Sequence, residues 1–400
     1  MAQRYLHPDS PWLLALLAAL VALGPLSVDM YLPAMPAMMR AFGTDISQMH
    51  LTLSIYLTGF ALFHLACGPL ADRYGRKPVL LAGTLLFVAA CIGCSRSESV
   101  GEMLFFRFLQ GIGACVGPTL ARAVARDVFG PTGAARALSL IAMLMALAPA
   151  VAPTLGGFLL LVLPWPSVFV FLGLYGAVMM VLIQLFLPES LPGIQSLHPR
   201  AIARNYGELL IDPFFLSVTV TSGLIYAGLM VYLASSSFIF IDMLGVPPHY
   251  FGFIFLGSVA GYMGGSALSA RLSRSQDSEH ILGRGVVMAT VATGLLLVSS
   301  RVWPASVAAI MLPMVIYSTA MGLVLPHAMA IALKPFAHIA GTASALLGFI
   351  QMSLAAATSA LTGQFLTTTP QPMVWMLVII ALTSLVLGLR AHRLYTRTRS

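Results

Sequence analysis

The chain has 400 residues, of which 59% are hydrophobic and only 8% are Asp, Glu, Lys or Arg. Soluble domains carry about 25% charged residues, so this composition excludes a soluble protein and indicates a chain that crosses a membrane many times. The net charge of +8 is explained by basic loops, because no basic stripe interleaved with stacking aromatic residues points to nucleic acid as a partner.

Twelve apolar runs are long enough to cross a bilayer, which takes about 20 residues. They begin near Trp12, Gln48, Val79, Gly101, Ala137, Ser167, Phe214, His249, Gly285, Ala305, Thr342 and Met373. We therefore predict an all-α integral membrane protein with two pseudo-symmetric six-helix bundles, residues 1–187 and 213–400, joined by a cytoplasmic linker, residues 188–212. The sequences at 133–138 and 341–346, which open the fifth and eleventh runs, match at four of six positions; this supports a repeat, with chance matching as the alternative.

The Lys and Arg residues predict the orientation. With both termini in the cytoplasm, 17 of the 21 basic residues lie on the cytoplasmic side, and only Arg40, Arg96 and Arg301 lie on the outer side. The first apolar run is too long for a secretory signal and is interpreted as a retained span. We expect a multi-pass protein of a bacterial inner membrane.

Asp29 lies in the first predicted span. A carboxylate in hydrocarbon is costly and usually faces a cavity or a partner, so we predict that Asp29 gains and loses a proton. The alternative is that Asp29 lies at the outer interface and caps the span, because Pro33 and Pro36 soon end the helix.

The loop between the second and third spans, residues 68–77, concentrates charge between two apolar runs. It resembles the corresponding loop of major facilitator superfamily transporters, with a motif made of Gly68, Asp72, Arg73, Gly75 and Arg76. An ordinary positive-inside loop explains the basic residues but not Asp72 and the glycines. The resemblance implies a gating role, in which Asp72 accepts backbone N–H groups at a helix N-terminus and Arg76 pairs with Asp127.

The fourth span contains Arg107, Gln110, Gly111 and Gly113 in the pattern Arg-x-x-Gln-Gly-x-Gly. An arginine cannot discharge, so within a span it needs a carboxylate, carbonyl groups or water nearby. The stretch is similar to the fourth helix of proton-coupled facilitators, which implies that Arg107 faces a central cavity and takes part in proton transfer. A purely structural ion pair is the alternative.

The fifth span resembles the Gly-Pro-x-x-Gly-Gly signature of facilitators that work as antiporters. The residues that carry this resemblance are Pro149, Pro153, Gly156 and Gly157, and Ala152 replaces the usual glycine before Pro153. A helix with small packing residues and proline kinks is the alternative.

The predicted lining of the substrate cavity combines aromatic, Met and amide side chains, which suit a pliable lipophilic pocket. It consists of Tyr31, Gln110, Tyr226, Met230 and Gln351; generic helix packing is the alternative for each. His64 and His327 are interpreted as packing residues and left outside the site. Cys91 and Cys94 have metal-ligand spacing but no second ligand pair, so we expect no metal site.

Within the superfamily the chain looks closest to the drug:proton antiporters of the Bcr/CflA group, on the residues 29–36, the loop motif, residues 152–157 and residues 341–351. Val21 stands where better-studied multidrug relatives carry a further acid. The resemblance implies a monomeric antiporter, not an enzyme, that lies in the lipid bilayer and exports small lipophilic antimicrobials across the bacterial inner membrane by alternating access. Protons are the expected coupling ion, and no cofactor is expected. The alternatives are a nutrient or metabolite transporter of the same fold and a non-transporting membrane receptor or enzyme.

Overall fold

The computed structural model describes residues 10–145, 148–191 and 199–399, and within these ranges the regular structure is entirely helical. In the first half of the chain the elements are α1 (Pro11–Asp29), η1 (Leu32–Ala34), α2 (Met35–Phe42), α3 (Ile46–Tyr74), α4 (Arg76–Arg96), α5 (Val100–Met145), α6 (Ala148–Val162) and α7 (Pro166–Phe186). The second half contains α8 (Pro199–Ile211), α9 (Pro213–Ser237), η2 (Phe238–Met243), α10 (Pro248–Leu272), α11 (Ser278–Val302), α12 (Val307–Leu333), η3 (Ala337–Ile339), α13 (Ala340–Phe365) and α14 (Gln371–Arg399). This is the predicted membrane-spanning, all-α architecture.

Among the described residues, 11 helical segments are long and apolar enough to cross a membrane. The predicted fifth span differs from expectation. Residues from Ala137 onward continue α5, which runs unbroken from Val100 to Met145, and the 15-residue α6 follows. The Ala-rich stretch at 134–138 favours helix strongly enough to carry α5 through the predicted loop, despite the Gly130-Pro131 pair.

Local sequence signals explain several helix starts. The first turns of α1, α7, α9 and α10 each contain a proline, which needs no hydrogen-bond acceptor for its nitrogen there. Asp212 caps α9, because its side chain accepts the N–H of Phe215 at 2.6 Å. The break between α3 and α4 is a single residue, Gly75, whose φ of +101° is a conformation that other residues rarely adopt.

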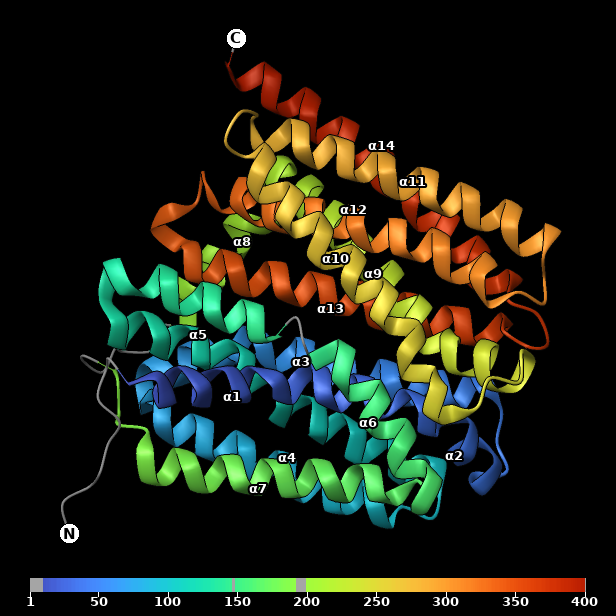
Figure 1. Cartoon of the computed structure of the whole chain (residues 1–400). Helices are drawn as coiled ribbons and strands as arrows, with labels where there is room; N and C mark the ends of the chain where they lie inside the picture. Colours follow the sequence, from blue (N-terminus) through green and yellow to red (C-terminus); the bar gives the residue numbers. More distant parts are fainter. Residues whose placement is uncertain (1–9, 146–147, 192–198, 400) are drawn as a thin grey trace. The chain divides into compact units, whose positions relative to one another are not determined.

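Contacts divide the chain into two compact units. The first consists of Met1–Thr44 and Ile55–His198, and the second of Asp45–Ser54 and Pro199–Ser400. Helix α3 therefore contributes to both, because its first turns pack with the second unit. In the first unit, α5 packs against α1 and α4, and α4 runs alongside α7 (Figure 1).

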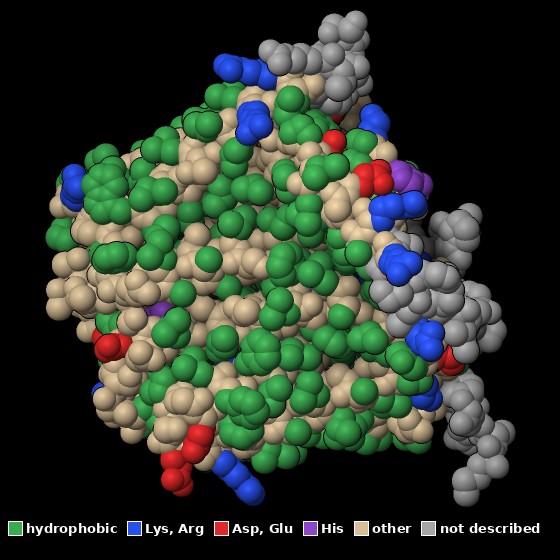
Figure 2. Space-filling model, turned by 180° about the vertical axis from the view of Figure 1, so that it is seen from behind, with side chains coloured by type: hydrophobic (Ala, Val, Ile, Leu, Met, Phe, Trp, Pro, Cys, Tyr) green, Lys and Arg blue, Asp and Glu red, His purple; other side chains and the backbone are tan. Residues whose placement is uncertain are grey.

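In the second unit, α9 packs against α13 and α14, and α12 packs against α10 and α11. Helix α11 lies alongside α12 and α14 (Figure 1). On the face drawn in Figure 2, hydrophobic side chains dominate and the charged side chains stand at its margins. A hydrophobic surface of this kind is what contact with lipid requires.

Candidate functional site

Arg107 lies on α5 and is fully buried. Its Nη1 donates a hydrogen bond of 2.6 Å to Oε1 of Gln110, one turn further along α5. The same nitrogen lies 3.3 Å from the backbone carbonyl oxygen of Ser27 on α1. Gln110 is held in turn, because its Nε2 donates to the Cys91 sulfur on α4 at 3.1 Å. Three helices thus position this guanidinium.

Aromatic rings complete the surroundings of Arg107. Its Cζ atom lies 4.3 Å from the ring centre of Tyr31 and 4.4 Å from that of Tyr56, and the ring of Phe169 is 5.9 Å away. The face of an aromatic ring attracts a cation, and the attraction is stronger away from water, about 2 kcal/mol or more. The rings and carbonyl oxygens therefore stabilise a permanent charge inside the unit.

Two nitrogens of Arg107, Nε and Nη2, are buried without a hydrogen-bond partner in the part of the chain that the structure describes. A buried donor left unsatisfied costs about 1–3 kcal/mol, and more when it is charged. The guanidinium therefore retains strong hydrogen-bonding capacity that its present protein contacts do not use.

Asp29 is the last residue of α1 and is only 4% exposed. Ser27 and Tyr31, which both contact Arg107, stand two residues before and two residues after Asp29. Within the described residues, no ion pair joins the Asp29 carboxyl to Arg107. The structure thus places the predicted proton carrier and the predicted arginine in the same unit, linked through the backbone around Asp29 and not by direct pairing.

Glycines of the fourth-span motif let α5 approach its neighbours closely. A Cβ atom at Gly111 would collide with the carbonyl oxygen of Tyr56 on α3, and one at Gly113 would lie 2.6 Å from the backbone nitrogen of Phe87 on α4. Close backbone approach at small residues is a common way to pack membrane helices. Here it brings α3 and α4 near enough to enclose Arg107.

The fifth-span signature lies on α6, where Pro153, Gly156 and Gly157 are buried and Pro149 is half-buried. A Cβ atom at Gly156 would collide with the carbonyl oxygen of Met30, directly after Asp29. The small residues of α6 therefore pack against the turn in which α1 ends.

The loop motif forms an ion-pair network. Nη1 of Arg76 lies 2.7 Å from Oδ1 of Asp72, and Nε of Arg76 lies 3.2 Å from Oδ2 of Asp127 on α5. The predicted contact between Arg76 and Asp127 is present. Arg73 lies in the last turn of α3, with its guanidinium 5.6 Å from the ring centre of Tyr74, and Gly68 lies one turn before Asp72 on the same helix.

Glu189, which the sequence interpretation did not single out, occupies the N-terminus of α4. Its carboxylate accepts the backbone N–H groups of Arg76 at 2.9 Å and of Lys77 at 3.1 Å. The contact expected for Asp72 with backbone N–H groups is therefore wrong: Asp72 binds the Arg76 side chain, and a carboxylate from beyond α7 caps the helix. The gating role of Asp72 stays a prediction. Gly75 leaves room for it, because a Cβ atom there would lie 2.5 Å from Oε2 of Glu189.

The second unit contains the other residues predicted to line the cavity. Tyr226 and Met230 lie one turn apart on α9, with Ser222 one turn before them. Gln351 of α13 reaches the same face of α9, because its Nε2 lies 3.4 Å from Oγ of Ser222. The structure therefore groups Gln351 with the Tyr226 and Met230 face of α9, and groups Tyr31 and Gln110 around Arg107.

His50, on the first turns of α3, is a buried polar residue that sequence reasoning missed. Its Nδ1 lies 3.0 Å from the carbonyl oxygen of Ser359 on α13, and its ring stacks on Phe238 at 5.9 Å between centres. A Cβ atom at Gly363 would collide with the His50 side chain. In the sequence, the available signal was that His50 is a polar residue within the predicted second span.

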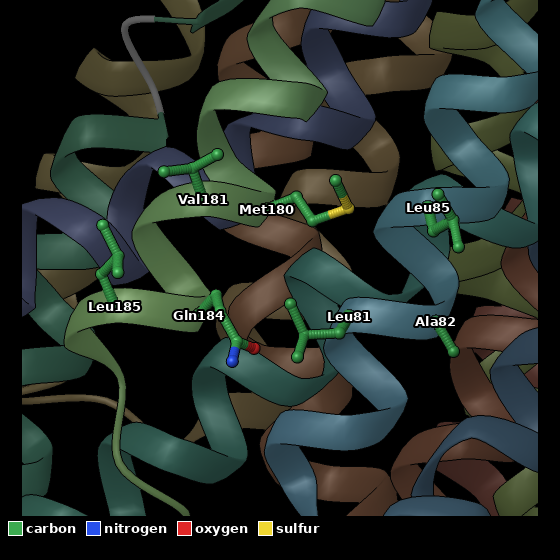
Figure 3. A pocket seen from close by; sticks show the side chains of 7 residues that line it. All are labelled: Leu81, Ala82, Leu85, Met180, Val181, Gln184 and Leu185. Carbon is green, nitrogen blue, oxygen red and sulfur yellow. The ribbon is translucent and has the colours of Figure 1, made fainter. Parts of the chain in front are cut away.

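A separate crevice lies between α4 and α7, with a volume of about 460 Å³. Its lining, shown in Figure 3, is Leu81, Ala82, Leu85, Met180, Val181, Gln184 and Leu185. Leu85, Val181 and Leu185 are each more than half exposed, so the crevice opens at the surface. It contains none of the residues predicted to bind substrate or protons.

Comparison with known proteins identifies the family. The model of the Major Facilitator Superfamily matches residues 17–360. The chain belongs to this superfamily. A relative named uncharacterized MFS-type transporter YdgK, of Bacillus subtilis strain 168, is 33% identical over 354 residues, which are 87% of each chain. The multidrug resistance protein MdtL of Escherichia coli strain K12 is 31% identical over 344 residues, 84% of each chain.

Solved structures agree with this facilitator in fold. A peptide transporter in complex with sulfate superimposes with a TM-score of 0.79 at 17% identity, covering 99% of this chain and 96% of the other. A D-xylose–proton symporter gives a TM-score of 0.73 at 13% identity, covering 96% and 97%. At these identities the likeness concerns the fold alone, and the predicted roles of the site residues stay predictions.

Proposed function

We propose that this facilitator exports small lipophilic, drug-like compounds across a bacterial inner membrane in exchange for protons. The buried Arg107 carries the proposal: two of its nitrogens are unpaired, and two of its contacts, Ser27 and Tyr31, lie on either side of Asp29 in the sequence. The similarity to MdtL supports the substrate class. We further propose that the protein works as a monomer with both termini in the cytoplasm, and that protons are its coupling ion.

In this mechanism Asp29 alternates between a protonated and an ionised carboxyl. The observed arrangement suits a neutral Asp29, because Arg107 is held by Gln110, Ser27 and aromatic rings without an ion pair. When Asp29 loses its proton, the unpaired Nε and Nη2 of Arg107 stabilise the carboxylate through small shifts of the turn after α1. Gly156 of α6, packed on Met30, makes this turn sensitive to movement of α6.

Proton flow provides enough free energy for useful export. One elementary charge moving through 100 mV releases about 2.3 kcal/mol. Since about 1.4 kcal/mol corresponds to a factor of ten, one proton exchanged for one uncharged substrate sustains a gradient of roughly fiftyfold. A pH gradient adds about 1.4 kcal/mol per unit.

The loop network of Asp72, Arg76 and Asp127 is proposed to control the change between conformations. Asp72 lies at the end of α3 and Arg76 at the start of α4, and Asp127 joins them from α5. Since no member of this network contacts the surroundings of Arg107, it changes the rate of transport and not the affinity for drug.

The test is a susceptibility panel in an efflux-deficient bacterial host. Expression of the wild-type chain should raise the inhibitory concentration of several lipophilic antimicrobials, and a protonophore should restore drug accumulation. Arg107→Ala, brought to the same level in the membrane, is the matched control and should give no protection. Equal susceptibility with and without the wild-type chain would contradict drug export.

A proton-coupled metabolite transporter is the second candidate. One observation favours it: the second unit buries hydroxyl groups without hydrogen-bond partners among the described residues, including those of Thr219, Ser235 and Ser318. Such groups recognise a polar substrate well, because the wrong substrate leaves them unpaired. Saturable uptake or release of one polar metabolite, unaffected by lipophilic drugs, would favour this candidate.

A further inference from the structure

A second polar cluster in the first unit plays no part in the mechanism above. His64 of α3 is buried, and its Nδ1 lies 3.3 Å from Oγ1 of Thr119 and 3.6 Å from the sulfur of Cys115, both on α5. The Cys115 sulfur also lies 3.6 Å from Thr119 Oγ1. These three side chains form a connected set of proton donors and acceptors, and Cys67 is hydrogen-bonded to Cys115.

On α3 the cluster is aligned with the surroundings of Arg107. Tyr56, Phe60 and His64 follow one another at four-residue spacing and so share a face. Their rings are in contact: the centres of Tyr56 and Phe60 are 6.5 Å apart, and Phe60 and His64 stack at 6.0 Å with 20° between their planes. Tyr56 is also one of the rings against Arg107.

The same alignment occurs on α5, where Arg107, Gly111, Cys115 and Thr119 follow at four-residue spacing. Gly111 packs on the backbone of α3, so the two helices stay in contact between the two clusters. The eight residues from Arg107 to Cys115 correspond to about 12 Å along the helix. With the predicted topology, the His64 cluster lies on the cytoplasmic side of Arg107.

The chemistry of the cluster accommodates both protonation states of an imidazole. When the His64 ring is neutral, Nδ1 accepts from the Thr119 hydroxyl or the Cys115 thiol; when it is protonated, Nδ1–H donates to the Thr119 oxygen. The titratable and charged groups around the cluster are Cys67, which is hydrogen-bonded to Cys115, and three arginines. The charge of Arg122 acts on the Cys115 thiol, that of Arg76 acts on Cys67, and that of Arg126 acts on Arg122. A histidine whose Nδ1 has a hydrogen-bond partner in both states is suited to binding and releasing protons.

We propose that His64, with Cys115 and Thr119, forms a second proton-binding site that takes the proton released from Asp29 and passes it to the cytoplasm. The inference rests on the proposed proton exchange. The proton leaves the Asp29 carboxyl, is carried by water, becomes the Nδ1–H of His64, and leaves again to restore the neutral ring. The apolar ring of Phe60 lies between the Tyr56 hydroxyl-bearing ring and His64, so transfer requires water to enter.

His327 provides a matched control. It is a histidine of the second unit whose Nε2 lies 2.9 Å from the hydroxyl of Ser269. The carboxylate whose charge acts on it, Glu279, is not buried, and the described part of that unit buries no Asp, Glu or Arg. His327→Gln should therefore leave coupling unchanged, whereas His64→Gln removes the titrating ring and keeps a polar side chain of similar length.

The first measurement needs no transport. The measurement is nitrogen NMR of protein with nitrogen-labelled histidine in lipid nanodiscs. The His64 resonance is identified as the one that disappears in His64→Gln. We expect it to change from the resonance of a protonated ring to that of a neutral ring as the pH is raised, and to change at a different pH in Thr119→Val. A His64 ring that keeps one protonation state at every pH at which the protein stays folded would overturn the proposal.

The second measurement is drug-driven proton exchange in proteoliposomes at several internal pH values. His64→Gln should lower the exchange rate at least about tenfold and remove its dependence on internal pH, with drug affinity changed less than about twofold. Exchange equal to that of His327→Gln would overturn the transfer role. If the wild-type protein exchanged no protons for any drug, the proposed function would fail, and the resonance titration would still decide whether His64 binds a proton.

Discussion

The two units bury different kinds of polar group. The described part of the first unit buries an acid and a base, Asp29 and Arg107, together with the amide of Gln110. The described part of the second unit buries Ser, Thr and Tyr hydroxyls and two histidines, but no Asp, Glu, Lys or Arg. Because permanent charge in a membrane interior is costly, it is kept where a function requires it.

This difference suggests a division of labour. In the first unit, three helices contact one guanidinium, that of Arg107. The gain or loss of one proton nearby should therefore change the interactions of all three helices. The second unit offers neutral groups such as the Gln351–Ser222 pair and the flexible Met230, which adapt to different substrates at small cost. Coupling is therefore expected to depend on the first unit, and substrate preference on the second.

Neutralising Asp29 should have the largest effect, because it tests whether coupling depends on the first unit. Asp29→Asn removes the titrating carboxyl and keeps its size, so drug-driven proton release should be abolished while the protein remains inserted. The measurement is proton release from proteoliposomes on addition of drug, with Asp242→Asn of the second unit as the control. Release at the wild-type rate in Asp29→Asn would remove this residue from coupling.

Replacing Arg107 should have the next largest effect. Arg107→Lys keeps the charge but loses the planar guanidinium that bonds Gln110 and Ser27 and lies against Tyr31. We expect coupled exchange to fall about tenfold, corresponding to about 1.4 kcal/mol. Arg107→Ala should fall further, by about a hundredfold. If the lysine variant matched the wild-type protein, the charge alone would be sufficient and the ring contacts irrelevant.

Loosening the loop network should slow transport without changing affinity. Glu189→Gln removes the charge that caps α4, an interaction worth about 0.5–2 kcal/mol, and should reduce the turnover several-fold. Asp72→Asn, which weakens the contact with Arg76, should act in the same direction. Drug binding measured on purified protein is the control. A loss of affinity as steep as the loss of turnover would argue that these residues belong to the substrate site.

The smallest effect is expected in the second unit. Gln351→Leu removes the hydrogen bond to Ser222 and should change drug affinity by a factor of about five, or about 1 kcal/mol. The number of protons exchanged per drug should stay unchanged. A changed proton-to-drug ratio in this variant would show that coupling is shared by both units.

The sequence predicted the contacts that depend on local spacing or on a strong motif. Arg107 and Gln110 are three residues apart on one helix, so their contact follows from helix geometry. The pairing of Arg76 with Asp127 followed from the resemblance of the loop to a known family. The all-helical fold followed from the long apolar runs alone.

Contacts between distant residues could not be predicted in this way. Glu189 caps α4 from 113 residues along the chain, and His50 reaches Ser359 across 309 residues. In both cases the partner is a backbone group, which every residue possesses, so side-chain chemistry in the sequence does not reveal it. The aromatic surroundings of Arg107 were missed for a related reason, since Tyr and Phe are common in any apolar span.

The contact between Gly75 and Glu189 has a consequence for the evolution of this loop. The carboxylate occupies the space that a side chain at position 75 would need, and the φ of +101° at Gly75 further disfavours other residues. The two positions should therefore vary together among related chains. Wherever residue 75 acquires a side chain, the acid at 189 should be lost and α4 should begin on a different cap, so an alignment of relatives can detect the contact without any structure.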